Sequence, residues 1–321
     1  MKANLTIQHE LPGNTSLSVG YLGGRGIHLW RQVDANSAVT TIVNGRPLVA
    51  RGTPRLNPNT GGGAIHYSDA QSFYNALQVE VKKRFSHGLQ FQSAYTWSKT
   101  IDDTTSGIAG TDYLDPNGSD PYNPKADRGL SGLHLAHNLV VNGIYAFPSP
   151  GRSGLVSHLF GGWQFSGIFS ASSGGPFSAL MSGRHAPNLS PSANRQRPDL
   201  VASRSFSSII LGGPDRYFDS SAFVVPPPGF YGNAGRNILI GPGFTTMDAS
   251  LMKSTPLGIR EGARLEFRAD FFNLGNRANF ARPGFLQVLN PATAQPIPSA
   301  GRITQTVGTS RQLQFSLKLI F

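Results

Sequence analysis

The amino-acid sequence predicts an all-β fold, an antiparallel transmembrane β-barrel of which the 321 residues form about nine strands. Three observations predict this fold. Apolar and polar residues alternate along long segments, which gives each segment one apolar and one polar face. Short and long connections alternate between these segments, and aromatic residues gather near both ends of them. Together these features are typical of strands that cross an outer membrane.

The alternation is clearest in three segments. In residues 77–85, the apolar Leu77 and Val79 alternate with the polar Gln78 and Glu80. The stretches "LQFQSAYTW" and "ARLEFRADFF" follow the same rule, with successive side chains on opposite faces of a strand. From this pattern we expect nine strands, near residues 4–11, 15–22, 73–85, 89–98, 130–147, 161–173, 244–254, 262–273 and 311–321.

The connections between these strands alternate strictly in length. The short ones are expected at residues 12–14, 86–88, 148–160 and 255–262, and the long ones at 23–72, 99–129, 174–243 and 274–310. Loops this long are uncommon in compact soluble domains. A soluble β-sandwich is the alternative, and it would have shorter strands with turns about every 8–12 residues. The strand and loop lengths favour the membrane barrel.

The chain ends on the strand-like stretch "LQFSLKLIF", in which apolar residues recur at every second position. A last strand that ends on an aromatic residue resembles the signal by which the barrel assembly machinery recognises outer-membrane barrels. The residues assigned to this signal are Phe315, Leu317, Leu319 and Phe321. They would place the C-terminus and the short turns at the periplasm, with the long loops outside. Nine antiparallel strands cannot close, because the first and last would meet in parallel, so we expect the C-terminal portion of a larger barrel.

Composition narrows the range of functions. The chain contains no cysteine, which excludes disulfides and thiolate chemistry within it. The formal net charge is +11, but the basic residues are scattered and form no stripe interleaved with aromatics, so we expect no nucleic-acid partner. No apolar run approaches the roughly 20 residues of a membrane-spanning helix. An N-terminal signal peptide is not expected either.

Four segments resemble the Oar-like TonB-dependent outer-membrane transporters, which are abundant in acidobacteria. These segments are residues 74–103, 162–178, 233–257 and 264–283, and the last two are the more specific. The resemblance implies a barrel of 22 strands, filled by an N-terminal plug whose TonB box couples uptake to the proton gradient of the inner membrane. Many members also carry a carboxypeptidase regulatory-like domain. We expect residues 1–321 to be the barrel portion only, with the plug and the regulatory-like domain absent from it.

The charged residues on the polar strand faces are the candidate functional residues. We expect them to face the barrel lumen, where they would contact the plug or line the substrate path. They are Glu80, Lys82, Arg84, Arg264, Glu266, Arg268 and Asp270. The alternative is ion pairing across neighbouring strands, worth roughly 0.2–1 kcal/mol per pair.

Other patterns indicate little chemistry. The stretch "DYLDPNGSD" at residues 112–120 offers oxygen ligands for calcium, but its spacing departs from the EF-hand loop, so a solvated turn is expected. His134 and His137 would lie on opposite faces of one strand and could not share a metal. The glycines of "GGRGIHLW" at residues 23–30 are expected in a loop. We find no catalytic constellation, and we expect no enzyme activity and no cofactor.

Two functions remain for a barrel of this kind. The first is substrate uptake as part of a TonB-dependent transporter, with the outer-membrane lipids, lipopolysaccharide, the barrel assembly machinery and the TonB system as partners. The second is an adhesion or structural barrel whose long loops bind a surface partner without transport. Both place the protein in the outer membrane of a Gram-negative cell, and neither identifies the substrate.

Overall fold

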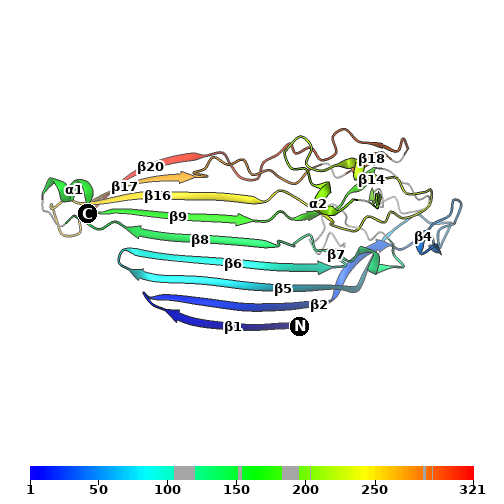
Figure 1. Ribbon diagram of the computed structural model, residues 1–321, viewed down its shortest axis with the longest axis horizontal. Coiled ribbons are helices and arrows are strands. Elements are labelled where there is room, and N and C mark those ends of the chain that lie inside the picture. The colour runs from blue at the N-terminus through cyan, green and yellow to red at the C-terminus, as the bar shows by residue number, and fades with distance from the viewer. Residues whose placement is uncertain (105–119, 151–153, 183–194, 203, 285–286, 291) are drawn as a thin grey trace.

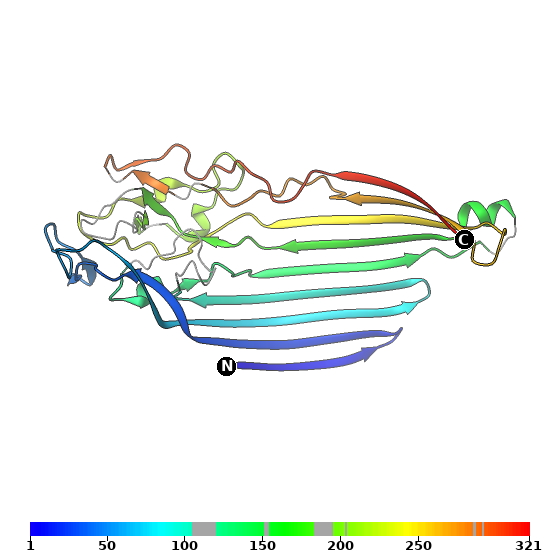
Figure 2. The same ribbon diagram turned by 180° about the vertical axis from the view of Figure 1, so that it is seen from behind.

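The computed structural model describes residues 1–104, 120–150, 154–182, 195–202, 204–284, 287–290 and 292–321. Its main feature is one large antiparallel sheet, in which strands that follow one another along the chain lie side by side (Figures 1 and 2). The long strands are, in sheet order, β1 (Lys2–Leu11), β2 (Thr15–Asp34), β5 (Ala64–Ser86), β6 (Leu89–Asp102), β8 (His137–Ala146), β9 (Trp163–Ser172), β16 (Phe244–Pro256), β17 (Arg264–Phe272) and β20 (Gln312–Ile320). The nine predicted strands are confirmed. The sheet is not closed, and β1 and β20 form its two edges.

The register gives the sheet one apolar and one polar face. Leu77 of β5 lies opposite Trp97 of β6, and Phe267 of β17 lies opposite Leu317 of β20. One residue further along, Gln78 lies opposite Thr96, on the other face. Directly opposite residues share a face, so these pairings extend the same division across the nine strands. The alternating pattern of the sequence is therefore realised as a continuous apolar face and a continuous polar face.

Two of the expected strands are longer than predicted. β2 continues to Asp34 and β5 begins at Ala64, so both ends of the segment predicted as a loop at residues 23–72 are an extension of the hairpin. The register shifts between Gly26 and Leu29, which marks a bulge. A Cβ atom at Gly26 would lie 2.5 Å from the Ser72 side-chain oxygen, so the two strands approach closely there. Glycine at a bulge carries no alternation signal, which is why "GGRGIHLW" was wrongly expected in a loop.

The region of β8 also differs from expectation. The strand begins at His137, and residues 131–136 form a turn between it and the two-residue β7 (Gly129–Leu130), which pairs with β6. The short connection that follows contains a helix, α1 (Leu155–Phe160), which the sequence did not predict. Among the residues that the structure describes, we find no helix long and apolar enough to span a bilayer.

The long loops fold together at one end of the sheet, whereas the short turns, α1 and the C-terminus lie at the other end (Figure 1). We call the folded loops the cap. It comprises the described parts of residues 35–63, 103–136, 173–243 and 273–311. Its short elements are β3 (Thr41–Val43), β4 (Arg46–Leu48), η1 (Pro124–Asp127), β10 (Pro176–Phe177), β11 (Leu180–Ser182), β12 (Arg195–Gln196), β13 (Asp199–Leu200), α2 (Phe206–Ile209), η2 (Ser220–Ala222), β14 (Phe223–Val224), β15 (Leu239–Ile240), β18 (Gln287–Asn290) and β19 (Gln295–Pro296).

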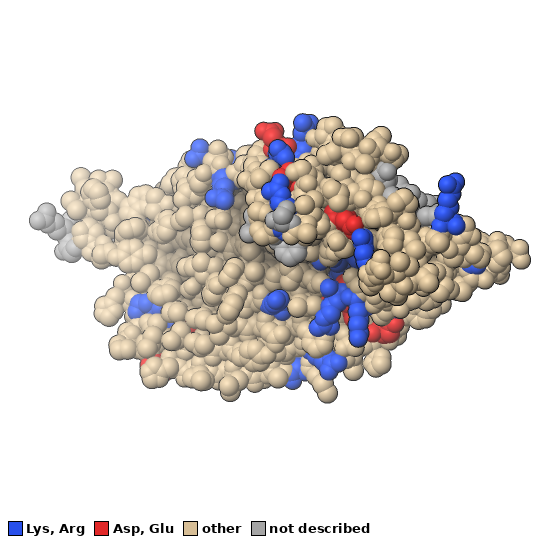
Figure 3. Space-filling view, turned by 45° about the vertical axis from the view of Figure 1, so that its right-hand side comes forward, with Lys and Arg blue, Asp and Glu red and all other residues tan. Residues whose placement is uncertain are grey.

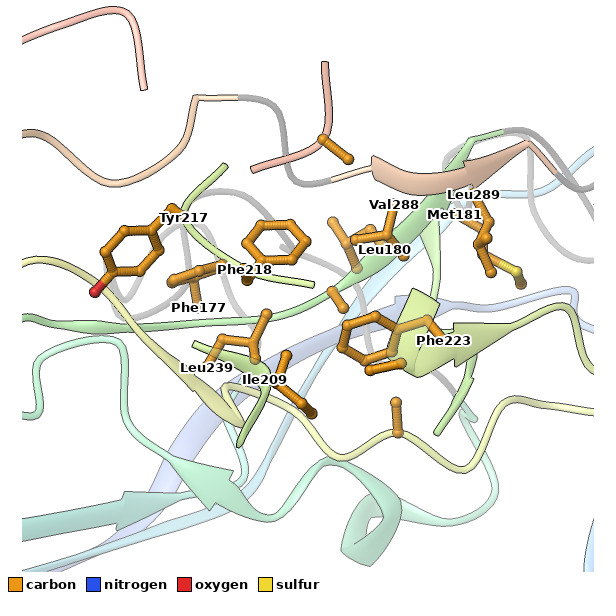
Figure 4. Close-up of a cluster of buried hydrophobic side chains, with 14 of the residues drawn as sticks. Phe177, Leu180, Met181, Ile209, Tyr217, Phe218, Phe223, Leu239, Val288 and Leu289 are labelled. Carbon is orange, nitrogen blue, oxygen red and sulfur yellow. The ribbon is translucent and has the colours of Figure 1, made fainter. Parts of the chain in front are cut away.

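The cap has a hydrophobic core of its own. Phe177, Phe218 and Leu239 come from the connection between β9 and β16, and Val288 and Leu289 come from the connection between β17 and β20; all five are at most 2% exposed. Figure 4 shows these side chains converging from both connections. The sheet, by contrast, carries large exposed apolar side chains on one face. The buried hydrophobic core of the described residues therefore lies in the cap and not in the sheet.

Candidate functional site

The predicted lumen residues of β5 lie on the polar face, in the half of the strand nearer the short turns. Glu80 lies opposite Ala94, and Lys82 lies opposite Gln92. The side-chain amide of Gln92 donates a hydrogen bond to Glu80, with 2.6 Å between nitrogen and oxygen. Arg84 follows Lys82 by two positions, so strand alternation places it on the same side.

The predicted lumen residues of β17 also lie on the polar face, and they pair with one another along the strand. Arg264 Nε lies 2.8 Å from Glu266 Oε1, and Arg268 Nε lies 2.8 Å from Asp270 Oδ1. Ion pairing across neighbouring strands was the alternative role for these residues, and within the described residues it is not found for these four charges. Residues i and i+2 of a strand lie on the same face, so each arginine can reach the carboxylate two positions further along its own strand.

The two charged groups are not brought together. Four strands separate β5 from β17 in the sheet, so the groups lie five strand spacings apart. At about 4.8 Å per spacing, this amounts to roughly 24 Å along the sheet. They could act on one bound molecule only if it were large. The structure therefore describes two separate charged rows on the polar face.

The residues of the predicted assembly signal share the apolar face of β20. Phe315, Leu317 and Leu319 lie opposite Ala269, Phe267 and Leu265 in turn. Their exposed fractions are 64%, 68% and 54%, and Phe321 follows the strand with 77% exposed. The face that they form is consistent with the predicted pattern, and their role as a recognition signal stays a prediction.

A pocket opens on the polar face where β16, β17 and β20 meet the cap. Its volume is about 320 Å³, at the lower end of the range for small-ligand sites. The lining residues are Phe244, Thr246, Asp248, Phe272, Asn273, Asn279, Val307, Gly308, Thr309 and Gln312. Most of them are polar. Apolar atoms nevertheless supply more of the exposed lining, so the site suits a ligand that packs against apolar surface and aromatic rings and makes a few hydrogen bonds.

Two buried asparagines build the wall of this pocket. Asn279 accepts a hydrogen bond from the Thr245 backbone N–H at 2.8 Å and donates one to the Thr245 carbonyl at 2.9 Å. Asn273 donates to the carbonyls of Arg277 and Thr309, each at 3.1 Å. Asp248 in turn accepts the backbone N–H of Asn273 at 2.8 Å. These contacts tie the last long loop to the ends of β16 and β17 and give the pocket a fixed shape.

Ion pairs of arginine with aspartate hold the cap together, both between two loops and within the third long loop. Arg46 reaches from the first long loop to Asp199 in the third, with 2.7 Å between Nη2 and Oδ1. Asp219 pairs with both Arg204 and Arg216. Burial opposes ionisation of Asp219, but hydrogen bonds from Ser221 and Arg216 outweigh it and hold the pKa of this carboxyl below its usual range. In Figure 3, most of the visible Lys and Arg side chains lie over the half of the molecule that carries the cap.

Two more arginines anchor the third long loop, Arg236 to the sheet and Arg197 to the second long loop. Arg236 is fully buried and pairs with Asp102 at the end of β6, which is 1% exposed. Its guanidinium also donates to the backbone carbonyls of Thr104 and Asp127, at 3.1 and 2.7 Å. Arg197 pairs with Asp127 at 2.8 Å, and both side chains are at most 6% exposed. The third long loop is therefore anchored to the second loop and to β6 through buried charges.

His134 links the turn before β8 to β6 through a hydrogen bond that depends on its protonation state. Its Nδ1 accepts the Thr100 backbone N–H at 3.3 Å, which requires an unprotonated nitrogen. Burial, and then the charge of Lys99, lower the pKa of His134. The unfolded chain, with an ordinary histidine pKa of about 6.5, then binds the proton more readily than the folded one.

We therefore expect the cap to lose stability as the pH falls below about 6.5, with the loss complete below the lowered pKa of His134. Limited proteolysis of the cap in intact outer membranes, at pH 7.5 and pH 5, measures this effect. His134→Asn keeps an acceptor for the Thr100 N–H without a titratable group. The dependence on pH should weaken in that variant, and an unchanged dependence would assign it to another group.

The remaining sequence patterns form no metal site among the described residues. Asp112, Asp115 and Asn117 of the predicted calcium loop lie outside them, whereas Asp120 is described, and burial raises its pKa. His134 precedes β8, and His137 Nδ1 lies 2.7 Å from the Tyr95 hydroxyl, so the two histidines have separate partners. Within the described ranges no group of three or more His, Asp or Glu side chains could hold a metal ion.

The pocket and the buried ion pairs of the cap were not predicted from the sequence. Asn273 and Asn279 stand in "NLGNRANF", which looks like an ordinary polar loop. One local signal was available, since asparagine tolerates the left-handed backbone better than most residues and Asn273 has φ of 49°. Arg236 and Asp102 are 134 positions apart, and no pattern in one sequence connects them.

Both the sequence and the fold of this chain are similar to those of known outer-membrane proteins. The sequence model of a family described as "Outer membrane beta barrel domain" matches residues 1–314. The outer membrane transporter YddB from Escherichia coli aligns with 98% of this chain over 32% of its own length, at 7% identity and a TM-score of 0.49. BauA, the ferric preacinetobactin receptor from Acinetobacter baumannii, aligns with 99% of this chain over 29% of its own length, at 12% identity and a TM-score of 0.43.

The chain thus spans about a third of the length of these two solved structures. A search of curated proteins found no significant match. The family match extends over nearly the whole chain, and the sheet has the apolar and polar faces that such a barrel requires. The chain belongs to the family of outer membrane β-barrel domains, and its location is the outer membrane.

Proposed function

We propose that this chain forms part of the wall and of the outer cap of a transporter that takes up a solute across the outer membrane. The observation that carries the proposal is the pocket between the polar face and the cap, with its wall of buried asparagines. In a membrane barrel the polar face lines the lumen. A ligand captured among the cap loops would meet this pocket on its way inward.

The finer assignment, an Oar-like TonB-dependent transporter, rests on the resemblance of the four segments. In this proposal a plug occupies the lumen, the charged rows of β5 and β17 contact it, and the TonB system drives its rearrangement from the periplasm. The barrel assembly machinery would recognise the last strand. The protein would catalyse no reaction. We propose no substrate, because the pocket gives a class of contacts and not an identity.

Filling the pocket should block uptake without harming the barrel. Thr246→Phe places a ring into the pocket, whereas Thr245→Phe changes the neighbouring residue on the apolar face. Host cells that carry the native gene, or either variant, are incubated with a defined mixture of nutrients. We expect at least one solute to be depleted by native cells and by Thr245→Phe cells, but several-fold more slowly by Thr246→Phe cells.

Two further results decide the mechanism. A protonophore should abolish the depletion if the TonB system drives it. If cells that contain the native barrel in their outer membranes deplete every solute at the same rate as cells without the gene, the proposal that this chain forms part of a transporter is wrong. A solute or protein that is retained at the cell surface, and that the protonophore does not affect, would instead support an adhesion barrel.

A further inference from the structure

The helix α1 exposes an apolar surface at the end of the sheet opposite the cap. Its four apolar residues occupy one arc of the helix, and Ser157 and His158 occupy the other. Leu155 is 80% exposed, Leu159 is 62% exposed and Phe160 is 65% exposed. A six-residue helix in a turn between two strands does not need three such side chains in order to close the turn.

Two side chains of the sheet hold α1 on the apolar side. Trp163 Nε1 donates a hydrogen bond to the Leu159 carbonyl at 2.9 Å, and Lys253 Nζ donates one to the Gly161 carbonyl at 2.8 Å. Trp163 and Lys253 lie directly opposite each other on β9 and β16, in the register of Phe165 and Leu251. They therefore belong to the apolar face, and the end of α1 is fixed over that face.

The exposed surface of α1 continues the apolar face of the sheet. Phe147, at the end of β8, is 43% exposed, and its ring packs edge-on against Tyr145 at 5.0 Å between centroids. The Phe147 backbone N–H is bonded to the Trp163 carbonyl. The ammonium of Lys253 lies 5.2 Å from the Trp163 ring centroid. Aromatic rings together with a lysine whose stem lies along apolar surface are typical of the boundary between lipid and water.

We propose that α1 lies in the plane of the membrane interface, with Leu155, Leu159 and Phe160 inserted between phospholipid headgroups and acyl chains. Short turns of outer-membrane barrels face the periplasm, so the leaflet concerned is the inner, phospholipid leaflet. Residues 148–162 contain no Asp or Glu, which suits anionic headgroups. A protein partner could also cover the apolar surface of α1. Lipid is favoured because, in a membrane barrel, it covers the apolar sheet face with which this surface is continuous.

The absence of cysteine from these 321 residues makes a direct test simple. A nitroxide spin label is attached to Leu159→Cys, or to His158→Cys as the matched control on the other arc. The full chain is reconstituted into vesicles of phosphatidylethanolamine and phosphatidylglycerol. Spin relaxation then compares the collision rates of each label with oxygen, which concentrates in lipid, and with a water-soluble nickel complex. We expect the ratio of oxygen to nickel collisions to be several-fold higher at residue 159 than at residue 158.

Each other outcome overturns the proposal. Equal access of the nickel complex to both labels would place α1 in water. Protection of residue 159 from both reagents would place a protein surface on the helix. A high oxygen ratio at both positions would mean that α1 is immersed, and not interfacial. Leu155→Cys repeats the measurement on the same arc in case a label at residue 159 disturbs the contact of Trp163 with the helix.

Discussion

Replacing Leu77 by arginine is expected to lower the yield of assembled barrel sharply, whereas replacing Gln78 by arginine leaves it almost unchanged. Leu77 lies on the apolar face, between Tyr21 of β2 and Trp97 of β6. An arginine at mid-membrane on the lipid side costs about 2–4 kcal/mol, and the cost falls toward the interfaces. Gln78 has its neighbours on the polar face, where a charge meets water and other polar groups.

Phe267→Arg tests the same assignment on β17, near the opposite edge of the sheet. Its ring is stacked on Phe315 of β20, at 6.3 Å between centroids, and it shares the apolar face. The measurement is the fraction of protein in outer-membrane preparations that shows heat-modifiable mobility on a gel. Comparable assembly yields for Leu77→Arg, Phe267→Arg and Gln78→Arg would contradict the facing of the strands.

The facing of the strands could be predicted because it depends on a local rule. Successive side chains on a strand point to opposite sides, so Leu77 and Gln78 are assigned to faces without knowledge of their neighbours. Only the register adds information, and it brings Leu77 next to Trp97 rather than next to a polar residue. The strands and the division of their side chains into two faces were thus predicted correctly, whereas the local structure near bulges and turns, as at Gly26 and His134, was not.

The cap could not be predicted because the apolar residues of its core do not recur at a regular spacing in the sequence. Phe177 and Phe218 stand in stretches rich in glycine, proline and serine, and Val288 stands in the short apolar run "FLQVL", so no regular spacing connects them. Their burial results from contacts between loops that are distant in sequence. The helix α1 is missed for another reason, since its six residues are too few to display a helical repeat.

The pairing of Arg236 with Asp102 should be the most costly cap contact to break from one side. The guanidinium is fully buried, and the Asp102 carboxylate balances its charge. Removing one partner of a buried pair typically costs about 3–5 kcal/mol, because the remaining charge stays in a medium that solvates it poorly. Asp102→Ala is therefore expected to detach the third long loop from β6.

Proteolysis of the cap in outer membranes, read together with heat-modifiable mobility, separates the cap from the sheet. We expect Asp102→Ala to expose the cap to protease while the barrel stays assembled. Glu266→Ala is the matched control, since it breaks the exposed pair with Arg264, which is worth roughly 0.2–1 kcal/mol. An unchanged cleavage pattern in Asp102→Ala would show that the pair does not hold the loop.

The double variant Asp102→Leu with Arg236→Met shows whether the charged pair positions the loop or only holds it in place. Removing both charges leaves apolar side chains of similar bulk, and such replacements are often neutral or stabilising. Arg236 also donates to the backbone carbonyls of Thr104 and Asp127, which would lose their donor in this variant. If stability is recovered but solute uptake is not, the arginine sets the position of the loop over the pocket. If both are recovered, close packing at the end of β6 is enough to hold the cap.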